Sequence, residues 1–328
     1  MHLRTRPVTL IGGALLVVAA CGTSNATPSA PSPASSAITV PGGSGQPAVL
    51  PIPITSEFGV GNNRTVFTLT DQSGKQVAGP DRTLTIGYHG PNGEAIPPAP
   101  QTFIWAVEGV NGVYAGHATF PTSGQWTAEF TTAAPGSAAE TTTFGLEVKG
   151  DTNVVSPGDA APSVKTPTLA DAGGDVSKVS SDPKPVPGFY QTSEDAALAG
   201  HKPFVLIFAT PKFCKSAVCG PTLDKLKPVA AAHPEMTFIN VEPYKLDASS
   251  GSLQPVLDPS NQLIPVEATN AFKLSTEPYV FVVGADGKVS SSFELVFSPE
   301  EIEAAVKVVE NAPAVSPAAS DTGSAGQG

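Results

Sequence analysis

The sequence is poor in charged and aromatic residues and contains only three cysteines. Charged residues make up 14% of the 328 positions and aromatic residues 7%, whereas the chain has 34 prolines and 32 glycines. This balance indicates globular domains joined by long linkers rather than one compact enzyme, and the length suits two ordinary domains. The net charge of −11 provides no polybasic surface, so we expect no nucleic-acid partner.

Motifs that bind cofactors or metals are also missing. We find no Ser/His/Asp constellation, no glycine-rich phosphate loop and no Cys/His quartet with zinc spacing. His89 and His117 lack the companion ligands of a copper site, and we expect both at the surface. The sequence therefore predicts no cofactor and no resident metal.

The apolar run at the N-terminus is too short to span a membrane. It covers residues 8–18 and follows Arg4 and Arg6, which is the arrangement of a signal peptide. The run ends in Val18-Ala19-Ala20-Cys21-Gly22, which resembles the lipobox of bacterial lipoproteins. The resemblance implies that residues 1–21 carry the signal and that a lipid on Cys21 anchors the protein to the extracytoplasmic face of the cell membrane. In the alternative, an ordinary signal peptide is cleaved nearby and Cys21 is incidental.

Composition divides the rest of the chain into folded and extended parts. Residues 22–46 are rich in Ser, Pro, Ala and Gly, which predicts a disordered stalk, and residues 311–328 predict a loose tail. Residues 151–190 again contain few large apolar side chains and predict an extended linker, in which 166–171 is suited to dock as an ordered patch. Folded domains are expected over 47–150 and 191–310.

Residues 47–150 have the pattern of an all-β domain. In Arg64-Thr65-Val66-Phe67-Thr68-Leu69-Thr70, apolar and polar side chains alternate with period two. Strands are expected over 64–70, 83–88, 102–107, 113–120, 125–130 and 143–148. Short strands at this spacing predict a β-sandwich. The stretch from Gly112 to Trp126 resembles the Ig-like modules of the YtkA/FixH and CopC type.

Residues 191–310 mix strands and helices. The continuous apolar run 203–208 is typical of a strand buried on both faces of a sheet. Further strands are expected over 236–241, 278–283 and 288–293, and helices over 194–199, 221–232 and 299–309. Ser193 and Ser298 stand at the expected N-caps of the first and last helix.

The segment from Phe208 to Asp224, with Cys214, Cys219, Gly220 and Pro221, resembles the active-site region of thioredoxins. In that family a buried strand ends in Phe, a turn carries a Cys, and a helix follows. Thr276-Glu277-Pro278-Tyr279 resembles the second family landmark, which implies that Pro278 is cis and faces the cysteines. The fold class predicted for the whole chain is therefore multidomain, an Ig-like sandwich plus an α/β thioredoxin-like fold.

The two cysteines are spaced C-x4-C rather than C-x-x-C. In a regular helix, residues five apart have Cα atoms about 8.6 Å apart, which exceeds the roughly 7 Å limit for a disulfide. We therefore expect Cys214 in the turn before the helix and Cys219 near its N-cap. A thiol at a helix N-terminus has a lowered pKa, and a second thiol close by can resolve a mixed disulfide. The pattern leaves open whether Cys214 or Cys219 is the nucleophile.

The sequence leads to a hypothesis with two alternatives. The hypothesis is a membrane-anchored, extracytoplasmic protein that performs thiol–disulfide exchange with exported proteins, or senses redox state, through Cys214, Cys219 and Pro278. One alternative is a non-catalytic binding or scaffold lipoprotein with a structural disulfide, although closing so short a loop stabilises a fold by only about 2 kcal/mol. The other is a copper-handling protein of the Sco type, which would need a histidine beside the pair.

Overall fold

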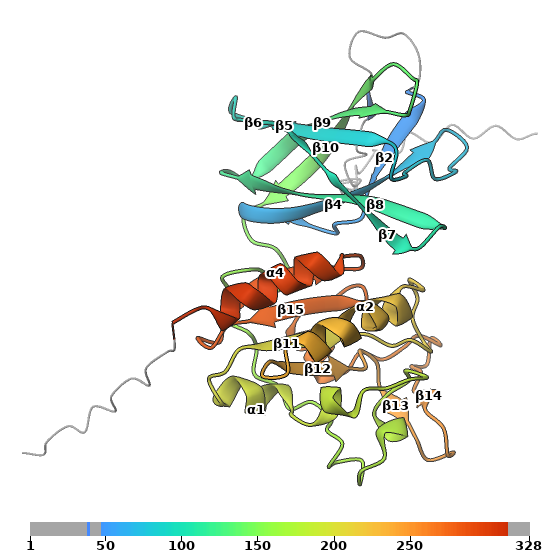
Figure 1. Ribbon diagram of the computed structural model, residues 1–328, viewed down its shortest axis with the longest axis vertical. Coiled ribbons are helices and arrows are strands. Elements are labelled where there is room, and N and C mark those ends of the chain that lie inside the picture. The colour runs from blue at the N-terminus through green and yellow to red at the C-terminus, as the bar shows by residue number, and fades with distance from the viewer. Residues whose placement is uncertain (1–37, 40–46, 314–328) are drawn as a thin grey trace, which may run out of the picture. The chain divides into compact units, whose positions relative to one another are not determined.

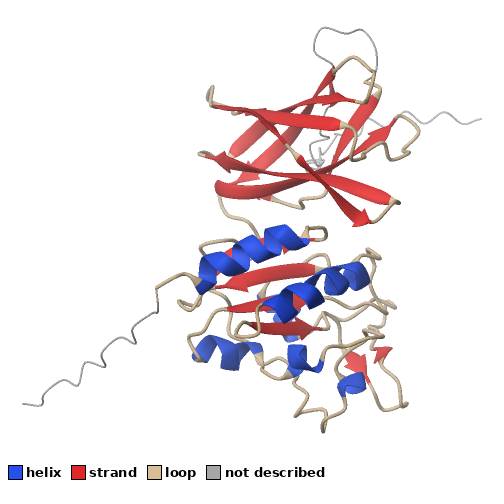
Figure 2. Cartoon of the chain, in the orientation of Figure 1, coloured by secondary structure: helices blue, strands red, loops and turns tan. Residues whose placement is uncertain are grey.

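The strands that precede residue 150 form two sheets, which Figure 2 shows in red in one half of the view. The computed structural model describes residues 38–39 and 47–313, so Cys21, the predicted signal peptide, most of the stalk and most of the tail lie outside the described residues. One sheet has the order β1-β10-β9-β5-β6, with β3 paired to β10, and the other has the order β2-β4-β8-β7. The bounds are β1 Ile38–Thr39, β2 Val49–Pro53, β3 Phe58–Gly59, β4 Gly61–Asp71, β5 Thr83–His89, β6 Ala95–Pro100, β7 Thr102–Val107, β8 Asn111–Phe120, β9 Gly124–Ala133 and β10 Glu140–Lys149.

These strands, the N-terminal lobe, enclose an aromatic core. Successive side chains of a strand point to opposite faces, and β9 accordingly buries Trp126, Ala128 and Phe130. The Phe67 and Phe130 rings meet edge to face with centroids 4.9 Å apart, a favourable aromatic geometry. All six strands predicted for this region are present. Strand β1 lies within the predicted stalk and pairs antiparallel with β10.

Two strands that the sequence did not predict contain prolines. Strand β2 carries Pro51 and Pro53, and β6 has the sequence Ala-Ile-Pro-Pro-Ala-Pro. Each of them ends the strand order of its sheet. A proline has no N–H to donate to a neighbouring strand. It is therefore tolerated at the edge of a sheet, where an N–H that points outward needs no strand partner. The prolines therefore hide these strands from pattern analysis and suit them to the positions they occupy.

The second half of the described chain is a four-stranded mixed sheet with helices, the C-terminal lobe. The strand order is β12-β11-β15-β16, with β11 parallel to β12 and antiparallel to β15 (Figure 1). The predicted helix over 221–232 begins two residues earlier, so that Cys219 is its first residue. The bounds are α1 Glu194–Ala199, β11 Phe204–Phe208, α2 Cys219–Ala232, β12 Thr237–Val241, β13 Leu246–Asp247, β14 Gln254–Pro255, α3 Glu267–Ala271, β15 Tyr279–Val283, β16 Val289–Glu294 and α4 Pro299–Glu310.

The central strand β11 is buried on both faces, as the apolar run predicts. Val205 and Ile207 pack with side chains of α2 and α4, including Leu223, Leu226 and Ile302. Phe204, Leu206 and Phe208 pack on the other face with Ala197 of α1 and Phe272 after α3. Ser298 accepts a hydrogen bond from Glu301 N in a capping box that starts α4. Ser193, by contrast, occupies the N-cap position of α1 without a side-chain capping bond.

The segment 151–190 covers both faces of this sheet instead of hanging free between the lobes. Val154, Ala161 and Val164 are buried on the face shared with α1. Phe189 and Tyr190 are buried on the face shared with α2, with Leu169, Val176, Val179 and Val186 packed against the same cluster. The predicted patch at 166–171 packs against this cluster through Leu169, whose N–H also donates to Tyr190 O. This segment is therefore an integral part of the C-terminal lobe.

Glu194 joins this segment to α1 and makes stability depend on pH. Its buried carboxylate accepts a 2.7 Å hydrogen bond from Val164 N, while burial and then the charge of Asp195 raise its pKa to about 7. A raised carboxyl pKa means that the folded state binds the proton more tightly than the unfolded state, so its contribution is lost as pH rises from about 4.5 to 7. We expect the urea midpoint of the protein to fall between pH 5 and pH 8. Glu194→Gln should remove its share of that fall, whereas the same change at the exposed Glu267 should not; an unchanged pH profile in Glu194→Gln would contradict this assignment.

The two lobes meet along a seam that is part apolar and part charged. The described residues of both lobes belong to one compact unit. Val66, Ile104, Ala106, Val113 and Ala115 of the first lobe form an apolar cluster with Val296, and Val218 and Leu295 pack against it. Arg64, whose side chain is 9% exposed, binds both carboxylate oxygens of Glu301 at 2.7 and 2.9 Å and donates to Val296 O. The seam thus reaches Val218, the residue next to Cys219.

Candidate functional site

Cys214 and Cys219 form a disulfide at the start of α2. Their Cα atoms are 6.0 Å apart, well within bridging range. The chain can close this loop because Cys214 precedes the helix, and because Ala217 adopts a left-handed conformation with φ of 62°. The prediction that Cys214 lies off the helix and Cys219 at its beginning is therefore confirmed. Pro221 occupies the opening turn of α2, where its missing N–H leaves no helical bond unmade.

The two sulfurs have different surroundings. Cys219 is fully buried in the core under α2, whereas Cys214 is partly exposed. Cys219 N donates to Cys214 Sγ at 3.3 Å, and Ser216 Oγ lies 3.2 Å from the same sulfur. In the reduced protein these donors and the N-terminal end of the α2 dipole would stabilise a thiolate on Cys214. Geometry thus favours Cys214 over Cys219 as the sulfur that meets a partner.

A buried carboxylate, Glu277, holds the cysteine loop in place. Its side chain is 3% exposed and accepts hydrogen bonds from Lys215 N at 2.7 Å and from Tyr244 OH at 2.6 Å. Its main-chain carbonyl accepts from Ser216 Oγ at 2.7 Å. Burial and the bond to Glu277 raise the pKa of Tyr244, so this phenol remains a donor at neutral pH. Glu277 was not predicted as a site residue, although its place directly before the expected cis-proline could have indicated a position near the cysteines.

The peptide bond between Glu277 and Pro278 is cis, as the resemblance implied. Because Glu277 binds Lys215 and Ser216, the structure brings the residues around Pro278 against the Cys214 loop. Pro278 O in turn accepts from Leu295 N, which ties the start of β15 to the end of β16. The three predicted site residues Cys214, Cys219 and Pro278 therefore belong to one locality.

A second acid, the partly buried Glu242, is linked to the cysteine loop through Ser181. Glu242, which follows β12, accepts a 2.6 Å hydrogen bond from Ser181 N, and burial raises the pKa of its carboxyl group. Ser181 Oγ accepts a 3.2 Å hydrogen bond from Lys212 N, so Ser181 contacts the start of the loop that carries Cys214. Ser181 lies in the segment predicted as a linker, and nothing in its local sequence indicates a position at the site.

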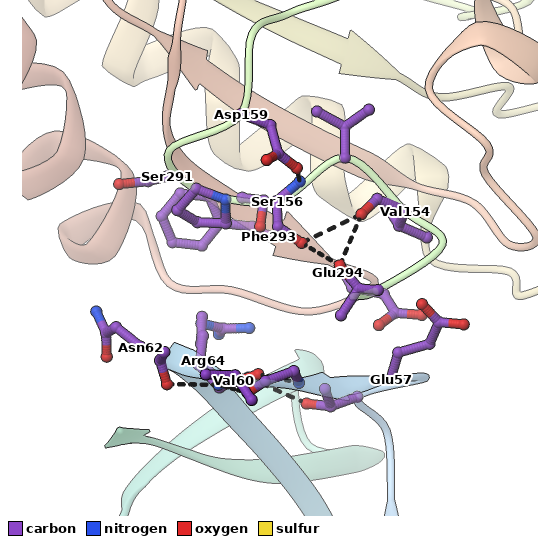
Figure 3. A pocket seen from close by; sticks show the side chains of 18 of the residues that line it. Glu57, Val60, Asn62, Arg64, Val154, Ser156, Asp159, Ser291, Phe293 and Glu294 are labelled. Atoms are coloured by element: carbon purple, nitrogen blue, oxygen red, sulfur yellow. Dashed lines mark hydrogen bonds between the residues drawn. The ribbon is translucent and has the colours of Figure 1, made fainter. Parts of the chain in front are cut away.

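The seam between the lobes contains a polar pocket of about 500 Å³. Figure 3 shows Arg64 and Asn62 of β4 facing Phe293 and Glu294 of β16 across it. Three of its charged side chains already have partners: Arg64 binds Glu301, Glu294 accepts from Ser56 N at 2.9 Å, and Glu57 binds Lys149. Neither cysteine lines this pocket, and we regard it as part of the contact between the lobes.

No group of three or more His, Cys, Asp or Glu side chains that could hold a metal ion is found within the described ranges 38–39 and 47–313. His89 ends β5 and His117 lies in β8, so the structure places them on different sheets. Both are exposed. Within the same ranges, none of the helices is long and apolar enough to cross a membrane.

Comparison with known proteins gives little further guidance. No family model and no curated protein matches the sequence. A solved structure, a DUF4426 family protein from Pseudomonas aeruginosa PAO1, is similar over 28% of this chain and 77% of its own, at 17% identity and a TM-score of 0.22. A likeness of this extent carries no argument about fold or activity.

Proposed function

We propose that the protein exchanges disulfides with exported proteins through Cys214 and Cys219. The element order β11-α2-β12, then β15-β16-α4, with a cis-proline before β15, supports a thioredoxin-like fold for the C-terminal lobe. The two facing sheets of the N-terminal lobe support an Ig-like sandwich that acts as spacer or docking module. Lipidation of Cys21 would keep both lobes at the extracytoplasmic face of the membrane.

The observation that carries the proposal is the unequal burial of two bonded cysteines at a helix N-terminus. A partner thiolate can reach the partly exposed Cys214 but not the buried Cys219. Attack on Cys214 Sγ forms a mixed disulfide, breaks the bond to Cys219 and leaves the electron pair on the Cys219 sulfur, which takes up a proton. In the reverse direction, a Cys214 thiolate attacks a partner disulfide and Cys219 resolves the adduct.

Trapping experiments test this assignment of roles. In Cys219→Ser, the resolving thiol is gone, so Cys214 should accumulate a mixed disulfide with a dithiol-reducible partner protein or a model disulfide. In Cys214→Ser, the remaining thiol is buried, and we expect at least about tenfold less adduct because access limits exchange. Non-reducing electrophoresis with mass spectrometry measures both yields. Equal trapping by the two variants would contradict the roles, and no trapping by either would contradict exchange itself.

A structural disulfide is the alternative that one observation favours. Glu277, Tyr244 and Ser216 hold the loop tightly, as in a bond that serves stability. Structural disulfides have reduction potentials below about −300 mV, whereas exchanging pairs lie above that value. Equilibration of the pair with glutathione and dithiothreitol buffers therefore separates the two functions.

A further inference from the structure

A groove opens beside the cysteine loop, on the side of Ser181. It has a volume of about 670 Å³ and lies where residues 181–184, the turn after β11 and the first residues of α2 come together. Its lining residues are Ser181, Asp182, Pro183, Lys184, Pro211, Lys212, Gly220 and Asp224. Lys212 lies two residues before Cys214, and Gly220 directly follows Cys219. Neither cysteine lines the groove, but a chain segment in it would contact residues adjacent in sequence to the disulfide.

The charge around this groove differs from that of the whole protein. The lining contains two exposed lysines, Lys184 and Lys212, and two aspartates, Asp182 and Asp224. The full chain, by contrast, has 29 acidic and 18 basic residues. Basic residues are therefore a larger share of the charged groups at this groove than in the whole chain, and the exposed Lys215 directly follows Cys214.

The two aspartates of the groove form ion pairs within the lobe, whereas Lys212 and Lys215 contact aromatic rings and a carbonyl group. Asp182 and Asp224 share the ammonium group of Lys227 at 2.8 and 2.9 Å. The Lys215 ammonium lies 5.2 Å from the centre of the Tyr244 ring. That of Lys212 lies 5.4 Å from the Phe213 ring and donates to Leu253 O. Neither ammonium group has a carboxylate partner among the contacts of the described residues.

We propose that the exchange partner is an extended acidic segment carrying two thiols, and that this groove receives it. The inference rests on the proposed function and names the class of substrate. One partner thiolate attacks Cys214 Sγ and displaces Cys219, and the second partner thiolate then attacks the first partner sulfur and releases Cys214. The partner is oxidised by two electrons to a disulfide, the Cys214–Cys219 pair is reduced to two thiols, and the partner's two protons are passed to the pair.

Charge complementarity at such a site acts mainly on encounter and orientation. The Debye length is about 8 Å at physiological ionic strength, so only charges near the contact act on the partner. Lys184 and Lys212 line the groove, and the two aspartates that also line it, Asp182 and Asp224, are paired with Lys227. Complementary charge of this kind accelerates association, and the acceleration is lost at high salt.

Three dithiol peptides that differ only in the residues flanking their cysteines test the proposal. The flanks are Glu, Gln or Lys, and the oxidised full chain is the substrate. The reduction rate of the pair, followed by alkylation and mass spectrometry, is divided by the rate of the same peptide with the neutral hydroxyethyl disulfide, which corrects for thiol acidity. We expect the Glu peptide to exceed the Lys peptide by about tenfold at 20 mM salt and by less than about twofold at 500 mM.

Variants locate the effect. The double change Lys184→Gln and Lys212→Gln should reduce the Glu-to-Lys ratio at least threefold. Lys202→Gln should leave the ratio as in the wild type, because Lys202 is exposed and lies before β11, at the end of the strand opposite to Cys214. Equal rates for the three peptides, or a ratio unaffected by the double change, would overturn the acidic partner while exchange itself stands. Failure of every peptide, the Gln peptide included, would overturn the proposed function instead.

Discussion

Replacing Glu277 by alanine should lower the free energy of unfolding by about 3 kcal/mol. The change leaves the buried Tyr244 OH and the part-buried Lys215 N–H without their acceptor, and an unpaired buried group costs about 1–3 kcal/mol. The freed loop should also expose Cys214 more often, so that dithiothreitol reduces the pair about tenfold faster. Urea unfolding of the oxidised protein and the rate of reduction measure the two effects.

Two companion variants separate loss of these bonds from loss of any glutamate. Tyr244→Phe removes one of the two donors and should cost less than Glu277→Ala. Glu108→Ala changes an exposed glutamate on the turn after β7, where substitutions alter stability by less than about 0.5 kcal/mol. Were Glu277→Ala to unfold at the same urea concentration as Glu108→Ala, Glu277 would have no part in holding the loop.

Arg64→Ala should destabilise the protein by about 3–5 kcal/mol, the loss measured when one partner of a buried ion pair is removed. The side chain makes three polar contacts with α4 and the segment before it, and its guanidinium lies 5.4 Å from the Phe293 ring centre. Because these contacts join the two lobes, the unfolding transition should also lose cooperativity. Urea unfolding followed by circular dichroism records both changes, with the exposed Lys75→Ala as control.

A double-mutant cycle with Glu301→Ala identifies the interaction. Glu301 serves both Arg64 and the capping box of α4, so its single variant should cost more than the pair alone explains. The double variant should then be less destabilised than the two single variants added together. Strict additivity would show that Arg64 and Glu301 do not act as a unit.

Periodicity and apolar runs predicted the elements that lie inside sheets and cores. Strand β9 alternates in and out of the core, whereas β4 is buried at each position from 65 to 69 because its second face is covered at the seam between the lobes. Strand β11 is apolar throughout because both of its faces are covered. The C-x4-C spacing, combined with the reach of a disulfide, placed Cys214 before the helix and Cys219 at its start. In each case a single physical constraint acts on consecutive residues, so the sequence itself carries it.

Features set by contacts between distant segments were not predicted. Glu277 meets Lys215, 62 residues earlier, and Arg64 meets Glu301, 237 residues later. Nothing local distinguishes such side chains from solvated ones. The hairpin formed by β13 and β14 and the edge strands β2 and β6 were missed for another reason: they are short or rich in proline, and the pattern that marks a strand is absent.

The packed course of residues 151–190 fixes how far apart the lobes can be. Forty flexible residues would act as a long tether, along which one domain samples a wide volume around the other. Here β10 ends at Lys149 and Val154 is already buried against the C-terminal sheet, so residues 150–153 make the connection, and Asn153 is itself held by two hydrogen bonds to Glu57. That length spans about 17 Å at most when fully extended. The N-terminal lobe is thereby confined close to the C-terminal lobe, so that a ligand bound to one lobe would be held at a high effective concentration beside the other.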